Sequence, residues 1–355
     1  MAVSRINEAG LNVNQYGNRN IFQNGACLIS QRGTSFATAN GMTLDRWKVT
    51  KSGTVVNVVT QESDGPTGFS KSLKVSPSTA DSSLAASDYS LIIINIEGQD
   101  LQQLAYGTSG AKDLTMSFYA KSNVTGNITV TNEVNQGPPF QSRYFTISTA
   151  DTWTRHTLTW TGNPDTAIDN DNTTGIEFQM FLAAGSNFNS GTYNENWQTT
   201  GADRVRSDNI NLSSSTSNYF QITGLQIEVG DTATAFEHRS YGDELARCQR
   251  YCLVLDPQAA FAQYGFVGWC ESNTSVKTMR TFPVTMRSAP SFSRSGSFSY
   301  DGATSNPTFS SQVGVSTSVD SCRLEDTVSN GNTGQGVILI NQSDATAKIT
   351  FDAEL

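Results

Sequence analysis

The chain is poor in charged residues, and its charge balance is acidic. Charged residues make up 15% of the 355 residues, and the formal net charge is −9. Recognition of nucleic-acid phosphates requires a clustered basic face. Here the basic residues occur only as scattered short pairs, such as Arg204 with Arg206. We therefore expect no nucleic acid among the partners of this protein.

Long apolar segments are also missing. The longest apolar run, "LIIINI" at 91–96, is far shorter than the roughly 18 residues that cross a membrane as a helix. The first ten residues, "MAVSRINEAG", lack the apolar stretch of a secretory signal peptide. These absences predict no membrane insertion and no secretory leader.

Cysteine and histidine are scarce, which limits catalytic and redox chemistry. The five cysteines are odd in number and irregularly spaced, so we expect buried thiols and no disulfide framework. Only His156 and His238 are present, and no G-x-S-x-G elbow accompanies them. Glycoside hydrolysis would need two carboxylates about 5–9 Å apart, a distance that a sequence does not give. We expect a protein that is not an enzyme.

The residues that are abundant favour strands and turns. The chain has 18 Phe, 11 Tyr and 5 Trp, together with many β-branched residues, and both kinds suit pleated, half-buried strands. Ser, Asn and Gly, which suit turns, are also frequent. This composition predicts an all-β protein with long loops.

Apolar and polar residues alternate in many short runs. In "GIEFQMFLAAG" at 175–185, one face would carry Ile176, Phe178, Met180 and Leu182. Such period-two runs are typical of half-buried antiparallel strands. About ten of them precede residue 238, a number that suits two packed sheets, and we predict a jelly-roll β-sandwich.

The pattern predicts four segments. A polar N-terminal arm (1–20) precedes the jelly roll (21–238), a linking helix (239–253) and a smaller C-terminal β-sandwich domain (254–355). In "YGDELARCQRYC" (241–252), Cys248 and Cys252 would share one helix face, and Asp243 would be the N-cap. Zinc would need two further ligands, so we expect these thiols to pack as small apolar groups.

Seven stretches occur in an order that resembles a known group of proteins. They are "NGACLISQRGTSF", "LDRWKV", "IEGQDLQQLAYG", "DLTMSFYAKSN", "ITGLQIEVGDTATAFEHRSYGDELARCQRYC", "FPVTMRSAPSF" and the terminal "DAEL". Over roughly residues 20–355 the chain resembles tail-fibre and other virion structural proteins of tailed bacteriophages, and its N-terminal portion is similar to jelly-roll carbohydrate-binding modules. The resemblance implies a virion component made in the host cytoplasm, often a homo-oligomer, with a trimer favoured, and it supplies no catalytic residues.

One long polar segment stands out as a candidate ligand or partner surface. Residues 186–209 hold Phe188, Tyr193 and Trp197 among Asn, Glu and Arg. Aromatic rings stack on sugar faces while amides and carboxylates bond the hydroxyls, and long loops in compact domains are often functional. We predict that these three aromatics bind a glycan. A protein contact within the virion is the alternative, because Trp, Tyr and Arg also concentrate there.

The densest group of oxygen ligands lies in "NPDTAIDNDNTTGIE" at 163–177. Asp169, Asp171 and Glu177 have part of the spacing of a calcium loop, but the glycine at loop position six is missing. A structural calcium site and a solvated acidic turn are both compatible with this pattern.

Two hypotheses on function remain. In the first, the protein is a tail-fibre or spike subunit that recognises a host-surface glycan without enzymatic activity. In the second, it is a capsid decoration, head-fibre or tail-connector protein with a purely structural role. Both imply contacts with other virion proteins, with the arm docking on the particle.

Overall fold

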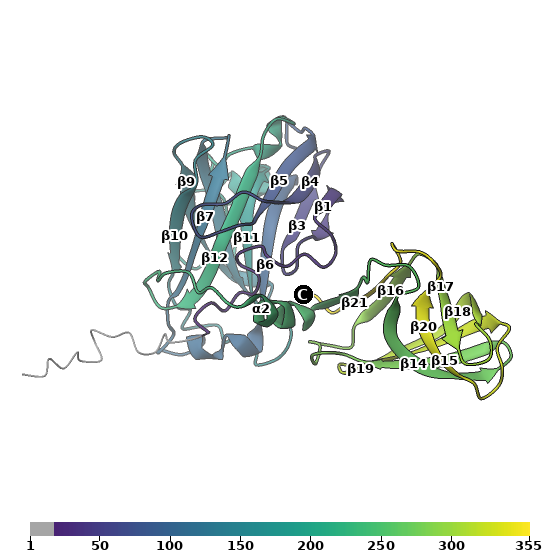
Figure 1. Ribbon diagram of the computed structural model, residues 1–355. Helices are drawn as coiled ribbons and strands as arrows, with labels where there is room; N and C mark the ends of the chain where they lie inside the picture. The colour runs from purple at the N-terminus through teal and green to yellow at the C-terminus, as the bar shows by residue number, and fades with distance from the viewer. Residues whose placement is uncertain (1–17) are drawn as a thin grey trace, which may run out of the picture. The chain divides into compact units, whose positions relative to one another are not determined.

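The computed structural model describes residues 18–355, which separate into two compact units. The first unit ends at Tyr241, and the second runs from Gly242 to Glu354 (Figure 1). Almost all regular structure is β, and the predicted fold class is confirmed. The predicted arm lies outside the described residues except for residues 18–20.

Two six-stranded antiparallel sheets make up the first unit, a jelly-roll β-sandwich (Figure 1). Sheet A has the order β1 (Ser35–Ala39), β4 (Val56–Glu62), β5 (Ser72–Thr79), β12 (Phe220–Val229), β7 (Leu114–Ser122), β10 (Thr154–Trp160). Sheet B has the order β2 (Gly41–Met42), β3 (Lys48–Ser52), β6 (Tyr89–Glu97), β11 (Thr174–Ala184), β8 (Gly126–Val134), β9 (Gly137–Ile147).

The core of the sandwich follows the alternation in the sequence. The four residues predicted to share one face of β11, Ile176 through Leu182, all belong to the main buried cluster. Trp47 is completely buried, and its ring meets Phe22 edge-on at 5.3 Å. Period-two patterning therefore located the inner face of β11 in sheet B.

The charged neighbours of Trp47 fasten the irregular segment that precedes the first strand. Asp45 accepts hydrogen bonds from the backbone and side chain of Gln31 at 2.7 and 2.6 Å. Arg46 donates to Gln23 at 3.3 Å and to the Asn95 carbonyl at 2.7 Å. Asp45 and Arg46 therefore tie this segment to the sandwich.

The segment before the first strand forms no ladder, and regular pairing begins only at Ser35. The Asn24 side chain donates to the carbonyls of Ile29 and Asp45 at 2.8 Å and accepts from the Ile29 amide at 2.9 Å. Side-chain amides that bond nearby backbone groups compete with a strand ladder. Residues 20–34 are therefore an ordered but irregular segment.

The second unit is a closed barrel with a small sheet, and the predicted two-sheet sandwich is corrected. The barrel order is β14 (Gln263–Ser272), β15 (Ser275–Thr281), β19 (Ser321–Ser329), β18 (Thr308–Thr317), β17 (Phe298–Gly302), β20 (Gly336–Asn341). The small sheet has the order β13 (Cys252–Leu255), β21 (Lys348–Asp352), β16 (Ser291–Ser295). Closure pairs every strand, so no sheet edge is left open in the barrel.

A buried ion pair joins the barrel to the small sheet. Arg294 on β16 donates two hydrogen bonds, at 2.9 and 2.8 Å, to the carboxylate of Asp326 on β19. Tyr300 donates a third hydrogen bond to the same carboxylate. A buried carboxylate needs such partners, because an uncompensated buried charge is strongly destabilising.

The predicted linking helix is shorter than expected. It spans α2 (Tyr241–Gln249), so Asp243 lies inside the first turn instead of at the N-cap. Cys252 is the first residue of β13, so it does not share a helix face with Cys248. The structure carries all five cysteines as buried thiols. None of the helices in residues 18–355 is long and apolar enough to cross a membrane.

We expect acid to weaken the first unit through His156. This ring packs against both Phe118 and Phe145, at centroid distances of 5.7 and 4.7 Å, and burial lowers its pKa from 6.5 to about 4. The unfolded chain therefore binds the proton more tightly, and this stability is lost as the pH falls from 6.5 toward 4. The loss should be about 1–2 kcal/mol, which allows for the ring's partial exposure.

Urea unfolding of wild type and His156→Phe at pH 7 and pH 4 measures this loss. The variant should lack that part of the acid sensitivity, and His238→Phe, at the exposed histidine, should keep it. Equal acid sensitivity in wild type and His156→Phe would contradict the assignment.

Candidate functional site

Residues 185–209, called loop 185–209 here, lie across the outer face of sheet B. The loop follows β11 and contains the short helix α1 (Ser186–Asn189). Phe188 and Val205 pack on Leu91, Ile93 and Phe181, which alternate with core residues and so point away from the core. The loop is therefore a covering layer on sheet B.

Backbone pairing fixes this loop to the edge strand β9. Phe140 and Gln198 exchange both backbone hydrogen bonds, at 2.9 and 2.8 Å. Ser142 on the same strand donates its hydroxyl to the Arg204 carbonyl at 2.8 Å. Edge strands expose unpaired backbone groups, and here the loop satisfies part of that edge.

Arg204 fixes the loop to the outer face of sheet B. Its guanidinium forms an ion pair with Glu133 on β8, donates to the Gln179 side chain at 3.1 Å, and lies 4.3 Å from the centre of the Phe140 ring. Burial raises the pKa of the Glu133 carboxyl, Arg204 opposes that rise, and the Glu177 carboxylate adds to it. The guanidinium therefore compensates the Glu133 carboxylate, which faces the like charge of Glu177 on the neighbouring strand.

A groove of about 440 Å³, called the sheet B groove here, opens beside the loop. Its floor and walls come from β3, β6, β11 and the loop. The lining residues are Asn40, Lys48, Thr50, Lys51, Tyr89, Leu91, Ile93, Glu177, Gln179, Phe188 and Arg204.

The lining combines flat apolar surface with hydrogen-bonding groups. The rings of Tyr89 and Phe188 meet edge-on at 5.9 Å at one end of the groove. Gln179 donates a hydrogen bond to Glu177 at 2.6 Å. Lys48 on β3 is paired with Ile93 on β6. Small-molecule sites combine apolar walls with a few convergent polar groups in this way, and typically measure about 300–1,000 Å³.

The three aromatics predicted to form one ligand site are dispersed. Phe188 lines the groove. Tyr193 lies 6.1 Å from Tyr144, with Arg206 placed 5.6 Å from its ring centre. Its hydroxyl is buried without a hydrogen-bond partner in the described chain, and burial raises its pKa.

Trp197 anchors the loop. Its ring packs against the main core and meets Tyr106 edge-on at 6.1 Å, and its indole N–H donates to the Thr161 carbonyl at 3.1 Å. The apolar partners of Trp197 come from distant parts of the chain, so its polar sequence neighbours gave a misleading impression of exposure.

The three predicted calcium ligands also lie in different environments. Asp169 and Asp171 are exposed in the loop before β11, and Asp171 accepts two hydrogen bonds from Thr173. Glu177 is buried on β11. Across residues 18–355 no three His, Cys, Asp or Glu side chains are grouped to hold a metal ion. The calcium site stays a prediction without geometric support.

Sequence reasoning missed Lys48, Tyr89, Gln179 and Arg204. A signal was available for the first three, since they occupy outward positions of strands whose inward residues are apolar. Their convergence depends on strand order, because β3, β6 and β11 are adjacent in sheet B but far apart in sequence.

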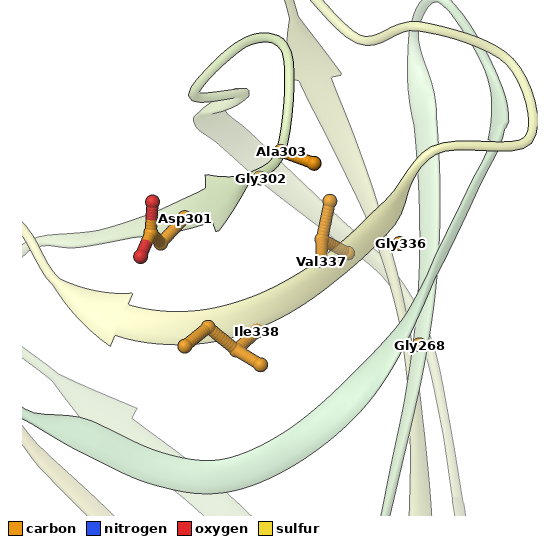
Figure 2. Close-up of a pocket in the computed structure, with 7 residues that line it drawn as sticks. All are labelled: Gly268, Asp301, Gly302, Ala303, Gly336, Val337 and Ile338. Atoms are coloured by element: carbon orange, nitrogen blue, oxygen red, sulfur yellow. The ribbon is translucent and has the colours of Figure 1, made fainter.

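The C-terminal barrel has a hollow of about 460 Å³ on its surface. Glycines 268, 302 and 336 border it, and Figure 2 shows Asp301 as the single charged side chain among the seven labelled residues. No aromatic ring lines this hollow. The sheet B groove therefore has the richer recognition chemistry.

Comparison with known proteins gives similarities of fold among solved structures. The enzymatically active domain of bacteriophage CBA120 tailspike protein 4 is 15% identical, with 59% of this chain and 21% of that chain covered and a TM-score of 0.33. A putative sugar binding protein from Bacteroides thetaiotaomicron is 12% identical, and the match covers 59% of this chain and 99% of that chain with a TM-score of 0.33. The family 11 carbohydrate-binding module from Clostridium thermocellum, in complex with a β-1,3-1,4-mixed-linked tetrasaccharide, is 12% identical, with 58% and 98% covered and a TM-score of 0.28.

The match spans about a fifth of the tailspike chain. No family model and no curated protein matches the sequence. TM-scores this low carry no argument about function, and the assignment of the jelly roll rests on the strand order.

We expect Trp197→Ala to destabilise the first unit by about 2–3 kcal/mol, because a partly buried indole leaves a cavity and an unmatched carbonyl. Thermal unfolding and limited proteolysis within 186–209 should both report the change. Tyr193→Phe, which only removes an unpartnered buried hydroxyl, should leave stability unchanged or slightly higher. Unaltered stability in Trp197→Ala would show that the ring does not anchor the loop.

Proposed function

We propose that the sheet B groove binds a glycan. The observation that carries the proposal is the convergence of two aromatic rings, Tyr89 and Phe188, with polar groups of both charges on one groove. Sugar rings present apolar C–H faces that pack on aromatic rings, and hydroxyls that bond to amides and charged groups. A groove on a sheet face also leaves room for a chain to extend past the bound residue.

In this proposal the protein binds and does not cleave. Glycoside hydrolysis requires two carboxylates that both reach the scissile bond. Glu177 borders the groove, whereas its cross-strand neighbour Glu133 is buried beneath Arg204 and ion-paired to it. Only one of these two carboxylates lines the groove, an arrangement that supports recognition of hydroxyls without hydrolysis.

The setting proposed for this binding is the bacteriophage virion. The ordered sequence motifs that resemble tail-fibre proteins support a tail-fibre or spike subunit, in which the groove meets the host surface. Assembly as a homotrimer would present several grooves at once, and multivalency raises avidity by about 10²–10⁴-fold over a single site.

Substitutions in the groove should weaken glycan binding without unfolding the protein. We expect Lys48→Ala and Tyr89→Leu each to reduce affinity about tenfold for a glycan selected on an array of bacterial surface polysaccharides. Titration calorimetry with that glycan measures the effect. Lys112→Ala, an exposed lysine outside the groove, is the matched control. Undiminished affinity in both groove variants would refute the groove as the site.

Immunogold labelling of intact virions tests the setting separately. The expected label is at the tail tip, where a host-recognition subunit must lie. Label on the capsid or at the tail connector would instead support the purely structural alternative.

A further inference from the structure

A second pocket lies on the outer face of sheet A, distant in the fold from the sheet B groove. It encloses about 350 Å³. It is called the aromatic pocket here and is lined by Thr67, Phe69, Ser117, Tyr119, Arg155, Gly224, Ala235, Phe236 and His238. Nothing in the function proposed above uses it.

Three rings surround Phe69 in this pocket. The centroid of Phe69 lies 5.4 Å from Tyr119, 5.0 Å from Phe236 and 5.2 Å from His238. Gly224 makes room for them: it has a φ of +63°, and an added Cβ would lie 2.7 Å from the Phe69 ring. The pocket therefore needs a glycine at this point in β12.

The wall containing Phe236 and His238 is held by buried polar residues of β12. Glu228 accepts hydrogen bonds from the Thr234 amide and hydroxyl at 2.9 and 2.7 Å, and Gln226 accepts one from the Glu237 amide at 2.7 Å. Both side chains point outward from the sheet yet are buried under this segment. The segment 230–240 is thus fastened to the sheet, and the pocket is preformed.

Arg155 supplies a positive charge at the mouth of the pocket. Its side chain is exposed on β10, and one terminal nitrogen, Nη2, donates to the Ser117 hydroxyl and the Thr234 carbonyl. Within residues 18–355 no carboxylate lies within ion-pair distance of Arg155, and its Nε and Nη1 donate to no protein group. The guanidinium is thus fixed through Nη2, and its Nε and Nη1 groups can each donate a charge-assisted hydrogen bond to an anionic group such as a carboxylate.

We propose that the aromatic pocket binds an acidic sugar residue, with its carboxylate on Arg155 and its ring face on Phe69 or Phe236. The hydroxyls of Thr67 and Ser117 and the imidazole of His238 supply partners for the sugar hydroxyls. The choice of a sugar rests on the proposed function, in which this unit meets glycans. The expectation that the sugar carries a carboxylate rests on Arg155 alone, and it distinguishes this pocket from the sheet B groove.

Binding of monosaccharides to the full-length protein tests the proposal. The ligands are glucuronic acid and N-acetylneuraminic acid, with glucose as the neutral comparison, and the readout is saturation-transfer NMR followed by affinity titration. We expect the acids to bind at least about tenfold more tightly than glucose, and added salt to weaken them, because the pair lies at the surface.

Variants locate the site. Arg155→Gln should lower affinity for the acids about tenfold, and Arg155→Lys, which keeps the charge but loses the planar guanidinium and its separate donors, should give an intermediate value. Phe236→Leu should weaken the acids and glucose alike. The groove variant Lys48→Ala should bind the acids as wild type does.

Three outcomes overturn the proposal: no preference for acids over glucose, full affinity in Arg155→Gln, or loss of the acids in Lys48→Ala alone. The last result would place acid binding in the sheet B groove. If the groove variants keep full affinity for their array-selected glycan while Arg155→Gln loses the acids, the groove fails and the aromatic pocket stands.

Discussion

The contact between Arg204 and Glu133 is the one on which the outer face of sheet B depends. Glu133 and Glu177 lie opposite each other on adjacent strands. Two like charges in this position destabilise the sheet. The guanidinium of Arg204 forms an ion pair with Glu133, and because Arg204 belongs to loop 185–209, this ion pair also fixes the loop to the sheet. The groove exists because the loop is held at its margin.

Both sheets of the jelly roll follow this plan. A segment that leaves one strand turns back over the outer face of its own sheet, bonds to polar side chains there, and leaves a pocket beside it. On sheet B the segment is loop 185–209, held by Glu133 and Gln179. On sheet A it is residues 230–240, held by Gln226 and Glu228. Buried, hydrogen-bonded polar groups on an outer sheet face thus mark where such a cover lies.

The alternation of apolar and polar residues was enough to predict the two sheets of the first unit. Sequence reasoning failed where burial or strand pairing depends on residues far away in the chain. Alternation placed Ile176 and Phe178 inside because strand geometry sends neighbouring side chains to opposite faces. The polar composition of residues 186–209 instead suggested that Trp197 is available to a ligand, although Tyr106 and the core cover it. Barrel closure in the second unit likewise depends on pairing β14 with β20, which no local pattern contains.

The candidate site was predictable only in part for the same reason. Phe188 was found from its composition-biased loop, whereas Lys48 and Gln179 meet it only through the order of strands β3, β6 and β11. Tyr193 and Trp197 shared the loop but face other partners. Sequence proximity is therefore a weak guide to a site built on a sheet face, where adjacency is set by hydrogen-bonded neighbours.

Amide hydrogen exchange is the most direct measurement of the central claim that loop 185–209 is a fixed layer on sheet B. The amides of Gly191, Gln198 and Val205 donate within the loop or to β9, so they should exchange slowly in wild type. They should exchange much faster in Arg204→Gln, while the amides of β11 stay protected. Rapid exchange of these loop amides in wild type, at the rate of an open surface loop, would contradict the account.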